Sequence, residues 1–191
     1  MSQYRQRGFV ACRKLGGGAA IQKTFAVSAA ASDAYFIGDA VTLSTNGKVT
    51  LLKNASTAAP LGVITALYSS SNGKPKPLTF NQPTSGPYLA TAQAGFAQVN
   101  IDANQTYIVE FGGNITQAGF GGAVKVSAGA PNTSTGLSGQ SLSSTISTSA
   151  DAQFQIIGLA PVELLDNRTS AASVGLVEVK MHRSIFGGNA V

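Results

Sequence analysis

Apolar and polar residues alternate on both sides of Asn46-Gly47, and this period of two is typical of half-buried strands. The apolar positions are Val41, Leu43, Val49 and Leu51. A two-residue Asn-Gly turn would put the two apolar pairs on opposite faces, whereas a three-residue loop over 45–47 pairs Leu43 with Val49 and puts all four on one face. We therefore predict the three-residue loop, with Gly47 in the left-handed conformation. A third, mostly apolar strand is expected from Leu61 to Leu67.

The same rhythm recurs along most of the chain, with turn signals between the runs. Further strands are predicted over residues 9–15, 23–28, 88–92, 95–101, 106–111, 115–118, 123–126, 152–159 and 174–185. The spacing predicts an all-β fold, a sandwich or open barrel of about eight to eleven short antiparallel strands. The predicted core contains Phe25, Val41, Leu43, Val49, Leu51, Val63, Phe96, Tyr107, Phe154, Ile156, Val177 and Val179.

Two stretches interrupt this rhythm. Residues 69–87 hold four of the seven prolines, and proline cannot donate to a sheet ladder, so an exposed excursion is expected there. Residues 127–150 carry no charge and are rich in Ser, Thr and Gly, which predicts a long surface loop with some ordered strand near Ile146. Both belong to a single β-rich domain over residues 24–191, preceded by a basic N-terminal arm over residues 1–23.

The net charge of +5 comes entirely from that arm. Five basic residues precede the first acidic residue, Asp33, and the remaining eight basic residues balance the eight acidic ones. Such an arm could bind nucleic acid, an acidic membrane or an acidic protein surface. Few aromatic residues accompany its charges, so we expect either a solvated, partly ordered terminus or an arm that clasps a neighbouring protein subunit. Gly16-Gly17-Gly18 is expected to be a hinge or a sharp turn. The expected capsid or subunit contacts are Arg5, Arg7, Phe9 (as an apolar anchor), Arg13 and Lys14.

Candidate catalytic chemistry is sparse. Cys12 is the single cysteine, which excludes an intrachain disulfide, and we expect it to be buried. The single histidine, His182, would need a nucleophile and an orienting carboxylate to act as a general base. Asp33 with Asp39, or Asp151 with Glu163, could form a carboxylate pair, but Asp39 after a glycine is expected to bond turn backbone. We predict no catalytic, cofactor or metal site.

Two stretches resemble proteins of tailed-phage heads. Phe36 to Leu67, with its Gly-Asp opening, Asn-Gly hairpin and Pro-Leu-Gly-Val-Ile strand, resembles the small β-modules of capsid decoration (cement) proteins. Asp151 to Gly187, with a Gly-Leu strand, a loop and a terminal Val-Glu-Val-Lys strand, is similar to the C-terminal part of podovirus-type structural proteins. The resemblance implies a non-enzymatic protein on the capsid exterior, bound to the major capsid protein where coat subunits meet, often as a homotrimer.

The expected function is therefore virion decoration, by bridging coat subunits of a bacteriophage capsid. The N-terminal residues do not match a secretory signal, so we expect synthesis in the host cytoplasm, with no specific nucleic-acid, membrane or small-molecule partner. Between Gly112 and Ala150 the one charge is Lys125, so strand edges are expected to be covered by further copies. The alternative is a tail, spike or surface module that recognises carbohydrate through residues 127–150; a hydrolase is the third hypothesis.

Overall fold

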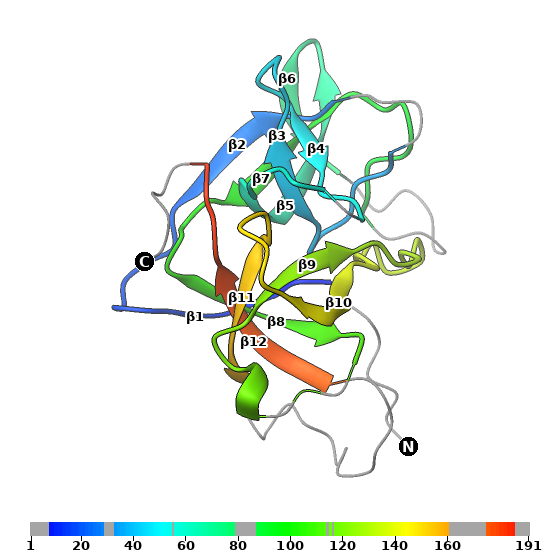
Figure 1. The fold of residues 1–191 in the computed structure, drawn as a ribbon. Coiled ribbons are helices and arrows are strands. Elements are labelled where there is room, and N and C mark those ends of the chain that lie inside the picture. Colours follow the sequence, from blue (N-terminus) through cyan, green and yellow to red (C-terminus); the bar gives the residue numbers. More distant parts are fainter. Residues whose placement is uncertain are drawn as a thin grey trace.

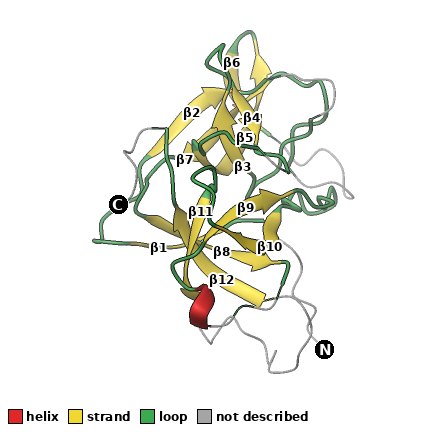
Figure 2. Cartoon of the chain, in the orientation of Figure 1, coloured by secondary structure: helices red, strands yellow, loops and turns green. Residues whose placement is uncertain are grey.

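The fold is nearly all β, as predicted. The computed structural model describes residues 8–28, 33–54, 56–78, 87–113, 115, 117–160 and 175–185. Among the described residues, strands account for 50% and helix for 1%; Figure 2 shows the strands in yellow. The elements are β1 (Val10–Lys14), β2 (Gln22–Ala26), β3 (Ala40–Leu43), β4 (Val49–Leu51), β5 (Gly62–Ser71), β6 (Lys74–Pro77), β7 (Gly95–Asn100), β8 (Gln105–Phe111), η1 (Gln117–Gly119), β9 (Ala123–Ser127), β10 (Ser141–Ser147), β11 (Phe154–Leu159) and β12 (Gly175–Met181).

The first sheet is a closed barrel of five strands, in the order β8-β10-β9-β11-β12, which fills the lower half of Figure 1. Closure comes from β8, which pairs with β12 along one edge and with the start of β10 at its end. The β10–β8 pairing is parallel. The expected open barrel of antiparallel strands is thus a closed barrel with one parallel pair. Strand β1 joins this sheet from outside, on the edge of β8.

The second sheet has the order β2-β7-β5-β3-β4, with β6 paired to the far end of β5 (Figure 1). Val27, just after β2, forms a parallel bridge with Val49 of β4, which brings the two ends of this path together. The barrel core includes Ala40 and Val63 from the second sheet, and Leu52 just after β4. The two sheets therefore share buried apolar contacts and form one body.

The predicted hairpin is confirmed in its register. Leu43 pairs with Val49, and the amide of Ser44 donates to the carbonyl of Lys48 at 2.8 Å across the three-residue loop. Gly47 has a φ of +76°, in the left-handed region that favours glycine. Val41 and Val49 are fully buried, and Leu43 and Leu51 pack against the same cluster. Face parity and one turn signal were therefore enough to define this part of the fold.

Most of the predicted core is buried. The predicted core residues that are 2% exposed or less are Val41, Val49, Val63, Tyr107, Phe154, Ile156, Val177 and Val179. Phe25, Leu43 and Leu51 are partly buried against the core, and Phe96 is half-buried. The predicted strand at 115–118 is wrong, because the chain forms the single turn η1 there. The predicted strand at 88–92 is reduced to an isolated bridge between Tyr35 and Leu89.

The proline-rich excursion begins as a β-ribbon. Strand β5 continues to Ser71, turns at Asn72-Gly73 with φ values of 51° and 73°, and returns as β6. In such a turn Ser71 and Lys74 form a hydrogen-bonded pair, so the pairs beyond them alternate between non-hydrogen-bonded and hydrogen-bonded. Pro75 and Pro77 then occupy positions whose backbone nitrogen faces the outer edge, where no donor is required. The prolines are compatible with this strand because it lies at an edge.

The uncharged tract at 127–150 is tied into the body rather than lying wholly on the surface. The predicted strand near Ile146 is confirmed as β10, which pairs with β9. Before it, the buried side chain of Gln140 accepts a hydrogen bond from the Ala40 amide at 2.6 Å and donates to the Leu52 carbonyl at 2.9 Å. These bonds attach the tract to the β3–β4 hairpin.

Candidate functional site

The residues predicted to make intersubunit contacts converge on strand β1. Phe9, Arg13 and Lys14 lie in or next to it, whereas Arg5 and Arg7 lie outside the described residues. Within the range expected to form a separate arm, β1 and β2 are each paired inside the body, one in each sheet. The described part of the arm is therefore integrated into the fold. Three sets of contacts hold this part of the chain in the body.

Phe9 is an apolar anchor for its own barrel. Its side chain is 3% exposed, stacks on Phe154 with ring centroids 4.5 Å apart, and meets Tyr107 edge-on at 6.3 Å. The preceding residue, Gly8, has a φ of +67°, and a Cβ there would lie 2.5 Å from Cβ of Ser138. The chain can enter the core at this point because residue 8 has no side chain.

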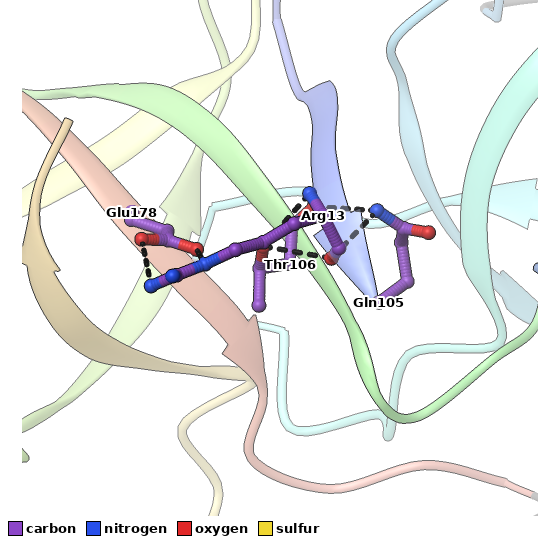
Figure 3. A network of polar contacts seen from close by, with 4 residues as sticks. All are labelled: Arg13, Gln105, Thr106 and Glu178. Carbon is purple, nitrogen blue, oxygen red and sulfur yellow. Dashed lines mark hydrogen bonds and ion pairs between the residues drawn. The ribbon is translucent and has the colours of Figure 1, made fainter. Parts of the chain in front are cut away.

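Arg13 binds Glu178 across the intervening strand β8. Its Nε lies 2.7 Å from Oε1 of Glu178 and its Nη2 lies 2.9 Å from Oε2 (Figure 3). Beneath the guanidinium, the hydroxyl of Thr106 donates to the Arg13 carbonyl at 2.9 Å, and Nε2 of Gln105 donates to the same carbonyl at 3.0 Å. Side-chain and backbone bonds thus connect β1, β8 and β12.

The electrostatics of this network depend on burial at one end. The side chain of Arg13 is 62% exposed, whereas that of Glu178 is 5% exposed. Burial alone would raise the pKa of the Glu178 carboxyl, but the hydrogen bonds from Arg13, with the charge of Arg13, outweigh it and lower that pKa. Glu178 is therefore a buried carboxylate that depends on Arg13 for its charge compensation.

Lys14 is also paired within the chain. Its Nζ lies 2.8 Å from Oδ2 of Asp102, in the turn before β8, and donates to the Ala19 carbonyl at 3.0 Å. Asp102 also accepts the Asn104 amide at 3.0 Å within this turn. Burial would raise the pKa of Asp102, but the bonds from Lys14 and from backbone amides lower it. Both cations of β1 are thus neutralised by carboxylates of the body.

A hinge follows β1. Gly16, Gly17 and Gly18 have φ values of 89°, 76° and 84°, and no heavy atom lies within 4 Å of a Cβ built on the first two. The segment carries the chain from β1 in the barrel to β2 in the second sheet (Figure 1). The triple glycine, predicted to be a hinge or a sharp turn, begins with a turn in which the Gly17 amide donates to the Lys14 carbonyl at 3.2 Å, and it forms an exposed crossing between the sheets.

The other candidate residues have structural roles or none. Cys12 is exposed on β1, so its predicted burial is wrong: it lies on a strand at the margin of the sheet. Asp39 accepts the Phe36 amide at 2.8 Å, which confirms its predicted bond to turn backbone; burial raises the pKa of its carboxyl to about 7. His182 is half-buried, and Glu163 lies outside the described residues. Asp151 pairs with Arg183 at 3.3 Å.

Sequence reasoning missed Glu178, Asp102, Thr106 and Gln105 as partners of β1. The one indication for Glu178 in the sequence is its position in β12: it lies on the face opposite to the core face, between two buried valines. Among the described residues, no three His, Cys, Asp or Glu side chains are grouped to hold a metal ion. In the same part of the chain, no helix is long and apolar enough to cross a membrane. Comparisons with protein-family models, curated proteins and solved structures gave no match.

Proposed function

We propose that this chain is a non-enzymatic structural protein that decorates a phage capsid and stabilises it by bridging coat subunits. The observation that carries the proposal is strand β1, which is attached by one aromatic anchor and two ion pairs and followed by an exposed hinge. A strand attached by a few discrete contacts, beside an exposed run of three glycines, is suited to bind a neighbouring subunit once it leaves its own barrel. The resemblance of residues 36–67 to decoration-protein modules adds to it, since this stretch folds as β3, β4 and β5.

The mechanism is clamping. A protein that binds the assembled shell, but not separated coat subunits, stabilises the shell by mass action, by about 2.7 kcal/mol per site at a free concentration of 100 times Kd. The body is suited to resist outward pressure because Ala40 and Val63 of the second sheet pack in the barrel core. Force applied at one sheet therefore passes to the other through packed side chains rather than through a linker.

The experiment compares the heat stability of particles with and without the protein. We expect decorated particles to release their DNA at a higher temperature, and equal release temperatures would contradict the clamp. Replacing Arg5 and Arg7 by Ala should weaken attachment and reduce its salt dependence, because attraction between opposite charges on two proteins is screened by salt. The matched control is Lys74→Ala with Lys76→Ala, which removes two charges from the exposed ribbon.

A second candidate, carbohydrate recognition on a tail or spike, has one observation in its favour. A shallow hollow of about 370 Å³ lies over β9 and β10 and is lined by hydroxyl side chains and one ammonium group. Its lining residues are Lys125, Ser143, Thr145, Ile146, Ser147 and Thr148. A glycan array decides between the two functions: consistent binding that is lost in Thr145→Val would favour this one.

A further inference from the structure

The barrel is closed without β1. In the described part of the chain, β1 pairs with β8 alone, while the ring of β8, β10, β9, β11 and β12 is complete through the β12–β8 ladder. The chain then leaves the barrel to build the second sheet from β2 to β7, and returns at β8 (Figure 1). Strand β1 is thus an addition to the barrel, connected to the rest by the hinge at residues 15–21.

The side-chain contacts that attach β1 are discrete, and apart from the Lys14 bond to the Ala19 carbonyl their partners belong to the barrel or to the turn before β8. Phe9 packs on Tyr107 and Phe154, Arg13 binds Glu178, and Lys14 binds Asp102. None of these partners is close to β1 in sequence; Arg13 and Glu178 are 165 residues apart. A β1 strand from a second copy of the chain would meet the same groups in the same geometry.

The hinge permits such an exchange. Gly16, Gly17 and Gly18 already have left-handed φ values, and no heavy atom lies within 4 Å of a Cβ built on Gly16 or Gly17. The backbone can therefore change at these residues without a clash, at the cost of two local hydrogen bonds, from the Gly17 amide to the Lys14 carbonyl and from Lys14 Nζ to the Ala19 carbonyl. The seven residues from Leu15 to Ile21 span up to about 24 Å when extended. Exchange of an identical element through a hinge loop is a low-cost route to an oligomer, because it re-forms existing contacts instead of creating new ones.

We propose that β1 is exchanged between copies, so that residues 8–15 of one chain occupy the β8 edge of another. The partner is a second copy of this chain, and reciprocal exchange closes the pair. The inference shares the β1 contacts and the hinge with the proposed function, but its test uses the free chain without a capsid, so the two proposals can fail separately. With β1 exchanged, the arm contacts another subunit while its charges stay paired, because Arg13 and Lys14 would be neutralised by the neighbour's carboxylates.

A charge-swap complementation tests the exchange. Arg13→Glu and Glu178→Arg each place like charges together when β1 remains in its own barrel. Co-refolding the two variants matches both pairs only if strands cross between chains. We expect each variant alone to be poorly folded, and the mixture to yield folded protein that sediments as two copies, one of each variant. A mixture that behaves as the sum of its separate parts overturns the proposal.

Two controls guard against a variant that simply fails to fold. The double variant Arg13→Glu with Glu178→Arg restores the pair within one chain, so it should fold and assemble by itself. Because its strand mismatches the wild-type barrel, it should form no mixed oligomer with wild type, and free mixing of the two would contradict exchange. Deleting Gly16–Gly18 should shift the wild-type chain further toward the two-copy form, since a short hinge cannot fold back; a deletion variant that sediments as one copy would also contradict it.

Discussion

Strand β1 and the β5–β6 ribbon are both peripheral, yet they are attached in different ways. Side chains connect β1 to the barrel, with one buried ring and two ion pairs, and a seven-residue hinge joins it to the next strand. The ribbon is a continuation of β5 and closes through the two-residue turn Asn72-Gly73. The first attachment can be transferred to another copy, whereas the second cannot, because a tight turn holds β6 against its own β5.

The ribbon and the barrel also differ in how their sheet edges are protected. The outer edge of β6 is protected by Pro75 and Pro77 and by the exposed Lys74 and Lys76, all of which disfavour pairing with a further strand. The barrel removes most of its own edges by closing on itself. Self-association through open edges, which the low charge led us to expect, thus has less surface available than expected. Exchange of β1 provides a route to oligomers that does not need an open edge.

The largest effect is expected from Phe9→Ala. Removing a buried ring leaves a cavity between Tyr107 and Phe154, and such changes cost about 3–5 kcal/mol in the free energy of unfolding. Urea denaturation measures it, with Phe120→Ala, at an exposed position, as the matched control. A loss below about 1 kcal/mol would mean that β1 is not anchored by this ring.

The next largest effect is expected from Arg13→Ala. This change leaves Glu178 buried without its cation, which is more harmful than losing an exposed charge. We expect a lower Tm, together with faster hydrogen exchange along β1. Glu178→Gln in the same background should recover part of the Tm, because it removes the stranded charge. If Arg13→Ala melts like Lys74→Ala, the network in Figure 3 does not stabilise the fold.

Acid should destabilise the attachment of β1 before it destabilises the β5–β6 ribbon. The folded pKa values of Glu178 and Asp102 lie below their ordinary values of 4.5 and 3.8. Their contribution to stability is therefore complete above those ordinary values and is lost as the pH falls through the lowered ones. The ribbon contains no carboxylate between residues 69 and 77. Hydrogen exchange below pH 4 should increase at β1 before it increases at the ribbon, and the reverse order would contradict this assignment.

The smallest effect is expected from Gly73→Ala in the ribbon. Its φ of +73° is unfavourable for alanine by about 1–2 kcal/mol, although no neighbouring atom would clash with the added methyl group. The ribbon should fray locally, which hydrogen exchange at β6 would reveal, while the barrel keeps its Tm. A cooperative loss of the whole fold would show that the ribbon supports the body, and would contradict its peripheral role.

The sequence was most informative where local signals and face parity agreed. The β3–β4 register followed from four apolar positions and Gly47. The second Asn-Gly turn, at residues 72–73, was missed because the nearby prolines indicated a loop, and its strand is allowed only because those prolines face an outer edge. The pairs of Arg13 with Glu178 and Lys14 with Asp102 could not be predicted, because they depend on which strands flank β8. Barrel closure depends on the same tertiary information.

The most direct test of the central claim, that this is a capsid-decorating protein which grips its neighbours through β1, is a density map of a particle that carries it. The account predicts the two-sheet body on the outer surface, over contacts between coat subunits, with β1 of each copy in the barrel of an adjacent copy. A body located in the tail or inside the shell would contradict the proposed function. A decorated shell in which every β1 remains in its own barrel would contradict the exchange.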